Sequence, residues 1–256
     1  MMLRTQKRVF TIMVAGYRGL GKSSFVNTLF DQVIIPTCPK QSDKASMNLY
    51  VLDVSCEGVR RNISIIDSPG FGHYINDTKT HQNIENYIRS QFDAFLAEET
   101  KIRRNPHFED NRVHTLIYFI SPNPHGLSQN DIAFLKTVDN LVNIIPVVGK
   151  ADGLTAKELD LLRFNVMRQI KENSISVFDF ERDSYDVVGS SESFKGRKKH
   201  WGVVNINDPK YCDFSLLKEI LLSSYMDVLV EKTASDLYEE YRATVLPQIL
   251  PDTLRE

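Results

Sequence analysis

The sequence contains no apolar run close to the roughly 20 residues that a membrane-spanning helix requires, so no transmembrane segment is expected. Only three cysteines are present, Cys38, Cys56 and Cys212. Their odd number and wide spacing predict neither a disulfide framework nor a zinc site, and favour reduced thiols inside a cell. The formal net charge is only −2, so no overall field would recruit nucleic acid. Residues 1–8 lack the long apolar stretch of a signal peptide, and we expect a cytoplasmic protein.

Apolar runs typical of strands alternate with helix-type spacing along the 256 residues. Strands are predicted at 9–15, 47–55, 62–66, 113–120, 142–148 and 186–189, and helices at 24–30, 78–99, 128 onward, 155–173 and 215–245. Ser128 with Asp131, and Thr155 with Glu158, are expected to cap two helices, and Pro247 and Pro251 are expected to end the last one. This alternation predicts an α/β fold with a six-stranded, mostly parallel sheet covered by helices on both faces.

Residues 16–23 read G-Y-R-G-L-G-K-S and fit the phosphate-loop pattern G-x-x-x-x-G-K-[ST]. A predicted strand precedes the run and a predicted helix follows it, which is the context that the pattern needs. Glycines let successive backbone N–H groups point at phosphate oxygens, and the helix adds its positive N-terminal end. We expect Lys22 to reach the β- and γ-phosphates and the Ser23 hydroxyl to ligate Mg²⁺. The alternative is a glycine-rich turn with an exposed lysine.

A second motif, D-S-P-G at residues 67–70, ends an apolar strand. A carboxylate at that strand end, here Asp67, is suited to hold Mg²⁺ through water. The backbone N–H of Gly70 is placed to meet a γ-phosphate and to move when that phosphate leaves. The alternative is a plain exit from strand to turn.

A third motif, G-K-A-D at residues 149–152, again follows an apolar strand. The Asp152 carboxylate can accept two parallel hydrogen bonds, which matches the N1–H and 2-amino donors of guanine and not the edge of adenine. Lys150 would lay its aliphatic stem against the base. General GTPases have Asn at the first place of N-K-x-D, so Gly149 removes a side-chain hydrogen bond that braces the loop. The three motifs together predict a domain that binds GTP or GDP with Mg²⁺.

With these motifs the sequence resembles a septin over nearly all of its length. Residues 67–72 read D-S-P-G-F-G, close to the septin D-T-P-G-[FY]-G, and G-K-A-D is close to the septin A-K-A-D. Further similar stretches are D-N-R-V-H at 110–114, Y-F-I-S-P at 118–122, H-G-L at 125–127 and D-I-A-F-L-K at 131–136. The most specific stretch is G-R-K-K-H-W-G-V-V at 196–204, followed by Y-E-E-Y-R at 238–242. It resembles the septin unique element, which ordinary small GTPases lack.

The resemblance implies a subunit of a non-polar cytoskeletal filament, built with other septin subunits at the cell cortex or division site. One subunit contact would form across the nucleotide face and the other through the terminal helices. Gly189 would meet the guanine through its backbone, and Arg197 would stack on the base. Trp201 would belong to the nucleotide-side interface, although a core-filling aromatic is the alternative. His125 would approach the neighbour's nucleotide, or would simply pack on its own chain.

The resemblance therefore gives an expected set of site residues. Those expected to contact nucleotide are Gly16, Gly19, Leu20, Gly21, Lys22, Ser23, Ser24, Gly70, Lys150, Asp152, Gly189 and Arg197. Ser23 and Asp67 are expected at the metal.

A threonine in the first switch loop positions water in septins that hydrolyse GTP. Aligning back from Asp67 puts residues 44–46 near that place, and they contain no threonine. Thr37 lies too close to the first helix, and Ser42 or Ser46 could substitute only if the loop rearranged. We therefore expect hydrolysis to be lost or strongly slowed, unless the alignment in this loop is displaced by a few residues.

The two ends of the chain also depart from the family pattern. The sequence stops soon after Arg242 without heptads, so we expect a short septin without a C-terminal coiled coil, or a cut one. Before the first strand, only Arg4, Lys7 and Arg8 remain of the polybasic stretch that serves many septins as a lipid-binding patch. Weak contact with an anionic membrane is expected per subunit, and filament multivalency would amplify it.

Four regions are expected along the chain: a short basic segment at 1–8, a GTP-binding domain at 9–190, the unique element with the C-terminal helix at 191–247, and a tail at 248–256. The rival hypothesis is a monomeric regulatory GTPase switch. The stretch from 189 to 242 is superfluous to a minimal switch and favours the septin interpretation. An ATP-using P-loop kinase is disfavoured by Lys150 and Asp152 and by the lack of a candidate lid over an acceptor site.

Overall fold

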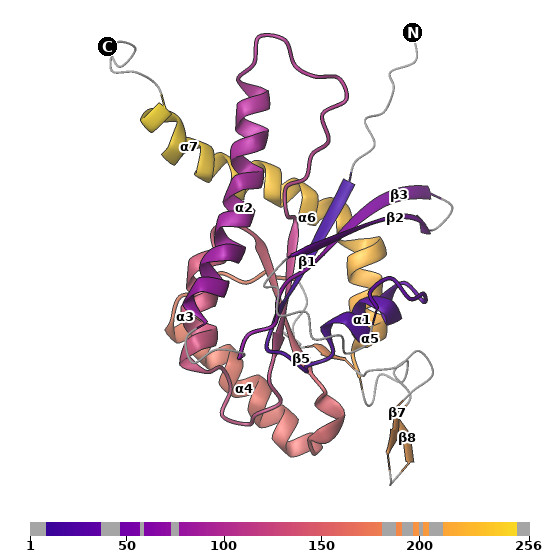
Figure 1. Ribbon diagram of the computed structural model, residues 1–256. Coiled ribbons are helices and arrows are strands. Elements are labelled where there is room, and N and C mark those ends of the chain that lie inside the picture. Colours follow the sequence, from indigo (N-terminus) through magenta and orange to yellow (C-terminus); the bar gives the residue numbers. More distant parts are fainter. Residues whose placement is uncertain are drawn as a thin grey trace.

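A six-stranded sheet organises the computed structural model (Figure 1). The structure describes residues 9–36, 47–56, 59–72, 77–180, 188–190, 197–199, 202–204 and 212–249. The strands are β1 (Val9–Gly16), β2 (Asn48–Cys56), β3 (Val59–Asp67), β4 (Thr115–Ile120), β5 (Asn143–Gly149) and β6 (Val188–Ser190), in the order β2-β3-β1-β4-β5-β6. Only β2 is antiparallel to its neighbour. The predicted mostly parallel sheet is therefore confirmed, and β2 pairs antiparallel with β3.

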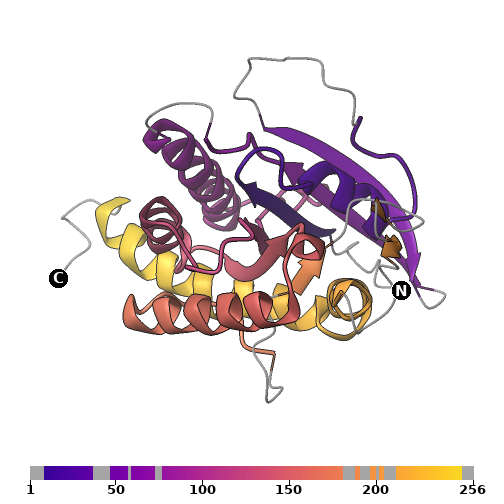
Figure 2. The ribbon, with the colours of Figure 1, turned by 90° about the horizontal axis from the view of Figure 1, so that it is seen from below.

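Alternating side chains of the central strands pack into two separate hydrophobic cores, one on each face of the sheet. On β1, Phe10, Ile12 and Val14 enter one core, whereas Met13 and Ala15 enter the other. This split follows from the two-residue period of a strand, whose successive side chains point to opposite faces. A sheet that is apolar on both faces has to be covered on both faces, and Figure 2 shows helices on either side of it.

The helices divide between these two faces. α2 (Thr78–Glu99), α3 (Gln129–Val138), α4 (Ala156–Glu172) and α7 (Tyr238–Ile249) pack on one face, and α1 (Lys22–Leu29), α5 (Phe214–Glu219) and α6 (Met226–Lys232) pack on the other. Both predicted capping boxes are present: Ser128 pairs with Asp131 at the start of α3, and Thr155 pairs with Glu158 at the start of α4. These local signals fix where the two helices begin.

The C-terminal helical region differs from the single helix predicted for 215–245. It begins at Phe214 and contains two π-helical turns, Ile220–Ser224 and Thr233–Leu237, with a break at Tyr225. Of the two prolines predicted to end this helix, Pro247 does not, because α7 continues through it and ends at Ile249, before Pro251. A proline so near a helix end removes only one backbone donor from the last turn, which limits its cost.

A small two-stranded ribbon follows the main sheet. β7 (Arg197–Lys199) and β8 (Gly202–Val204) pair antiparallel, within the stretch that resembles the septin unique element. Throughout the described ranges, every helix is too short or too polar to cross a bilayer.

Candidate nucleotide-binding site

The phosphate loop lies between the end of β1 and the start of α1 and requires its glycines. Gly16, Gly19 and Gly21 have φ of 134°, 81° and 90°, a region of backbone conformation that favours glycine. A Cβ at Gly16 would lie 2.4 Å from the Phe119 carbonyl oxygen, so no larger residue fits there without moving β4. The predicted strand, loop and helix are therefore present, in the shape that a bound anion needs.

Lys22 points its amine back over this loop. Its Nζ donates to the carbonyl oxygens of Gly16 at 2.9 Å and Tyr17 at 2.8 Å, and the side chain is buried. Burial lowers the pKa of Lys22 to about 8, although the nearby Asp67 carboxylate acts in the opposite direction. A buried cation under a loop of backbone N–H groups is electrostatically suited to a phosphate.

Asp67 and Ser23 stand together beside Lys22. Burial raises the pKa of Asp67, and the charge of Lys22 and a hydrogen bond from the Ser23 side chain oppose that shift. A carboxylate and a hydroxyl are oxygen ligands of the type that Mg²⁺ prefers. The two residues therefore fit the metal role predicted for them.

The segment after Asp67 is bonded directly to the phosphate loop. The backbone N–H of Arg18 donates to Phe71 at 3.0 Å, and that of Phe71 donates to Gly16 at 3.1 Å. A Cβ at Gly70 would lie 2.9 Å from the Arg18 Cα. Gly70 thus lies against the phosphate loop, where the predicted contact with a terminal phosphate requires it.

The base side of the site is formed at the end of β5. Lys150 adopts a left-handed conformation with φ of 57°, and Asp152 follows in a short 3-10 helix, Ala151–Gly153. A Cβ at Gly149 would lie 3.0 Å from the Leu20 carbonyl oxygen, so this loop packs closely on the phosphate loop. The register pairs Val148 with Gly189, which brings β6 to the same edge.

Most of the predicted nucleotide residues thus converge at the carboxyl ends of the parallel strands. Those brought together are Gly16, Gly19, Leu20, Gly21, Lys22, Ser23, Ser24, Asp67, Gly70, Lys150, Asp152 and, through its backbone, Gly189. The backbone of Arg197 lies in β7, and its side chain is outside the description. Thr37, Ser42, Ser46 and Trp201 fall outside the described residues. The predictions for these positions are therefore untested.

His125 is exposed in the loop between β4 and α3. Its backbone N–H donates to Asn123 Oδ1 at 3.1 Å, and its carbonyl accepts from Gln169 Nε2 at 3.4 Å. The backbone of this loop is therefore held by hydrogen bonds within the chain, while His125 itself is exposed and accessible to a neighbouring subunit.

One polar network beside the phosphate loop could not be predicted from the sequence. Tyr17, Asn130 and Asp77 are linked there by side-chain hydrogen bonds, with Asn130 Nδ2 within 3.2 Å of the Tyr17 hydroxyl and 3.3 Å of Asp77 Oδ2. These residues come from three distant parts of the chain, so no local pattern could have identified them.

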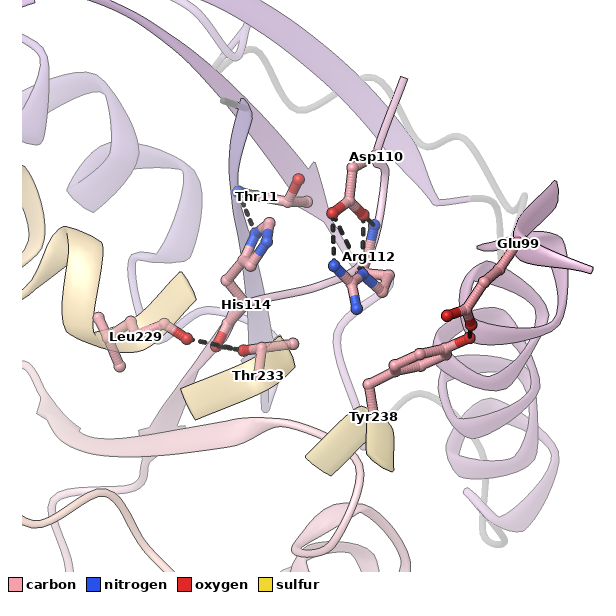
Figure 3. Close-up of polar contacts among 8 residues, drawn as sticks. All are labelled: Thr11, Glu99, Asp110, Arg112, His114, Leu229, Thr233 and Tyr238. Carbon is pink, nitrogen blue, oxygen red and sulfur yellow. Dashed lines mark hydrogen bonds and ion pairs between the residues drawn. The ribbon is translucent and has the colours of Figure 1, made fainter. Parts of the chain in front are cut away.

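A second cluster, here called the arginine cluster, lies before the amino end of β4 and consists of Phe95, Glu99, Asp110, Arg112 and Tyr238. Figure 3 shows its polar contacts. The Arg112 guanidinium lies 3.7 Å from the centroid of the Phe95 ring and 4.9 Å from that of Tyr238. It also bonds both carboxylate oxygens of Asp110, the shorter contact being 2.7 Å. The Tyr238 hydroxyl donates to Glu99 at 2.6 Å, so this arginine cluster fastens α7 to α2.

Comparisons with known proteins agree on one family. A septin model matches residues 6–188 and 184–252. The chain is 43% identical over 265 residues to Cell division control protein 11 of Encephalitozoon cuniculi, covering 96% of this chain and 98% of that protein. It is 35% identical to the Saccharomyces cerevisiae protein of the same name, covering 93% of this chain and 66% of the relative.

Solved structures of septins share the fold of this chain. The crystal structure of Cdc11 from Saccharomyces cerevisiae matches with a TM-score of 0.63 and 28% identity, covering 93% of this chain and 99% of that one. The septin GTPase domain of Chlamydomonas reinhardtii matches with a TM-score of 0.73 at 20% identity, over 93% and 99% of the two chains, and supports the fold alone. The fold is thus that of a P-loop GTPase, and the chain belongs to the septin family.

Proposed function

We propose that this chain is a septin subunit that binds GTP or GDP with Mg²⁺ and assembles with other septin subunits into hetero-oligomers and filaments. The observation that carries the proposal is the meeting of three strand-end motifs at one edge of the sheet. The phosphate loop contacts the segment after Asp67 and packs against the loop before Asp152. A site with phosphate, metal and base positions in contact is what a nucleotide requires.

Guanine selectivity rests on Asp152. Its carboxylate accepts two hydrogen bonds from the N1–H and 2-amino groups of guanine, whereas adenine offers neither donor at those places. Lys22 would hold the phosphates, and Ser23 with Asp67 would hold Mg²⁺, which neutralises phosphate charge when bound. Residues 44–46, which align with the first switch, contain no threonine, so hydrolysis would be slow or absent.

Assembly is proposed to use the two ends of the molecule. The exposed His125, with Trp201 and Arg197, would serve the nucleotide-side contact. α7, which the arginine cluster fastens to α2, would serve the terminal-helix contact. Two relatives bear the name cell division control protein, which supports a role at the division site or cell cortex. Residues 1–8 would add weak contact with an anionic membrane.

The substitution Asp152→Asn tests nucleotide identity. Asn offers one donor and one acceptor, which matches xanthine instead of guanine. We expect the affinity for GDP to fall at least about 100-fold and the affinity for xanthosine diphosphate to rise. Both are measured by competition against a fluorescent guanine nucleotide. Asp160→Asn, on the exposed face of α4, should leave both affinities unchanged. Equal GDP binding by wild type and Asp152→Asn would rule out this site.

Two measurements on the wild-type protein test assembly and turnover. The nucleotide released by denaturation should be guanine-based, and GTP alone would indicate a subunit that does not hydrolyse it. Electron microscopy at low salt, with sister septins present, should show filaments that dissolve at high salt. A monomer under all these conditions, with rapid nucleotide exchange, would instead support the regulatory switch.

A further inference from the structure

The side chain of Tyr17 leaves the phosphate loop and joins two other elements. Its ring packs edge-on against Phe71 at 6.1 Å between centroids, and its hydroxyl lies 3.2 Å from Ser128 Oγ. Asn130 Nδ2 donates to the same hydroxyl at 3.2 Å. The Ser128 proton is engaged by Asp131 at 2.7 Å, so the Tyr17 hydroxyl donates to Ser128 and accepts from Asn130.

Asn130 continues the connection to the segment that follows Asp67. Its Nδ2 also donates to Asp77 Oδ2 at 3.3 Å, and the same oxygen accepts the backbone N–H of Gly72 at 2.9 Å. Asp77 is buried, and Gly72 needs a positive φ of 81°. A buried carboxylate that loses one of its donors is destabilised, so the geometry around Gly72 depends on Asn130 being in place.

Tyr17 is also linked to the phosphate position through its backbone. Its carbonyl oxygen accepts from Lys22 Nζ at 2.8 Å. Tyr17 therefore contacts Lys22, the lysine expected at the phosphates, through its carbonyl. Its hydroxyl belongs to a series of hydrogen bonds that continues through Asn130 to Asp77 and Gly72. In the described structure these contacts are continuous, with each link a hydrogen bond.

We propose that Tyr17 is a latch that holds the turn at residues 68–72 and the start of α3 onto the phosphate loop, and so slows nucleotide release. The inference rests on the proposed nucleotide site and adds a positioning role within it. The effect of the latch is to keep the turn at residues 68–72 in contact with the phosphate loop.

Tyr17→Phe tests the latch because it keeps the ring against Phe71 and removes only the hydroxyl. We expect the dissociation rate of a fluorescent guanine nucleotide to rise at least about fivefold, because the hydroxyl makes two hydrogen bonds, with Ser128 and with Asn130. Asn130→Ala should give a similar rise. The rate of the double variant should rise by less than the product of the two single effects, because both changes break the bond between Asn130 and Tyr17.

Amide hydrogen exchange gives a second readout. The Gly72 amide should exchange faster in Tyr17→Phe than in wild type, and by a larger factor than the most protected amides of the central strands. Tyr241→Phe is the matched control, because its hydroxyl bonds Asp93 at 2.6 Å, in the C-terminal half of α2 and outside this network. It should alter neither nucleotide release nor exchange at Gly72.

The outcomes separate the latch from the proposed function. If wild type binds no guanine nucleotide, the proposed function fails, while exchange at Gly72 still compares wild type with Tyr17→Phe. Unchanged exchange in that variant overturns the latch. Unchanged nucleotide release in Tyr17→Phe also overturns it, because the latch requires release and Gly72 exchange to change together. Fully additive effects of Tyr17→Phe and Asn130→Ala overturn it as well, because the two residues would then act independently.

Discussion

His114 Nδ1 accepts a hydrogen bond of 3.0 Å from the backbone N–H of Thr11, and this joins the start of β4 to β1. An acceptor nitrogen cannot carry a proton, so the contact needs the neutral imidazole. Burial lowers the pKa of His114 from 6.5 to about 4, with Asp110 acting to raise it and Arg112 to lower it. The unfolded chain therefore binds more protons than the folded one between these two values.

Stability should fall as the pH is lowered from 7 to 5, because protonation favours the unfolded state in that window. His114 alone should account for about 2 kcal/mol of unfolding free energy at pH 5. His81, whose pKa is also lowered by burial, adds a change of the same sign. Urea unfolding at the two pH values measures the difference.

The control for this pH effect is His114→Asn, whose Oδ1 can replace the Nδ1 acceptor without titrating. The variant should be less stable at pH 7 and should lose less stability between pH 7 and 5 than wild type. His107→Asn, at an exposed loop position, should keep the wild-type slope. An unchanged slope in His114→Asn would contradict the assignment.

Arg112 is expected to control how firmly α7 is held. Arg112→Lys keeps the charge and loses both the fork to Asp110 and the planar stacking between Phe95 and Tyr238. We expect a loss of about 2 kcal/mol in unfolding free energy, and about 3 to 5 for Arg112→Ala. Both should also make α7 more sensitive to limited proteolysis.

Arg89→Lys is the matched control for Arg112. Arg89 pairs with Glu85 one helical turn away and is 40% exposed, so the exchange should cost less than about 0.5 kcal/mol. Equal costs for the two exchanges would show that the stacked arginine does not stabilise the terminal-helix end.

Local signals explain what the sequence could predict. The strands were identified by apolar runs, and α3 and α4 by capping pairs only three residues apart. The phosphate loop and the two later motifs were recognisable because each needs fixed residue types at fixed spacing. By contrast, Tyr17 and Asn130 are separated by 113 positions and meet only once the sheet is assembled. The π-helical turns in the C-terminal region likewise depend on packing, which no spacing encodes.

Gly149 should resist conversion to the asparagine of general GTPases. An added Cβ would lie 3.0 Å from the Leu20 carbonyl oxygen and 3.1 Å from the Leu20 Cβ, so the two loops would have to separate. We expect Gly149→Asn to weaken guanine nucleotide binding roughly tenfold, because overpacking costs about 1 to 3 kcal/mol. Gly153→Ala, where a Cβ meets nothing within 4 Å, should be neutral. Tighter binding by Gly149→Asn would mean that the hydrogen bond from the asparagine side chain stabilises the loop more than the close contact with Leu20 destabilises it.

Lys22 should stabilise the nucleotide complex at the expense of the nucleotide-free protein. Its pKa is lowered from 10.5 to about 8, so the buried ammonium remains charged at pH 7 and carries a penalty of about 3 kcal/mol. That penalty is present below pH 8 and decreases as the pH rises toward 10.5. Lys22→Met removes the charge, and the Gly16 carbonyl keeps its bond from Phe71.

We therefore expect nucleotide-free Lys22→Met to unfold at a higher temperature than nucleotide-free wild type, while its nucleotide affinity falls at least about 100-fold. GDP at about 100 times its wild-type dissociation constant should raise the unfolding temperature of wild type and raise that of the variant much less. Lys79→Met, on the exposed surface of α2, should change neither quantity. If the variant were less stable than wild type without nucleotide, the two carbonyl contacts of Lys22 would outweigh its burial, and the lysine would be structural as well as phosphate-binding.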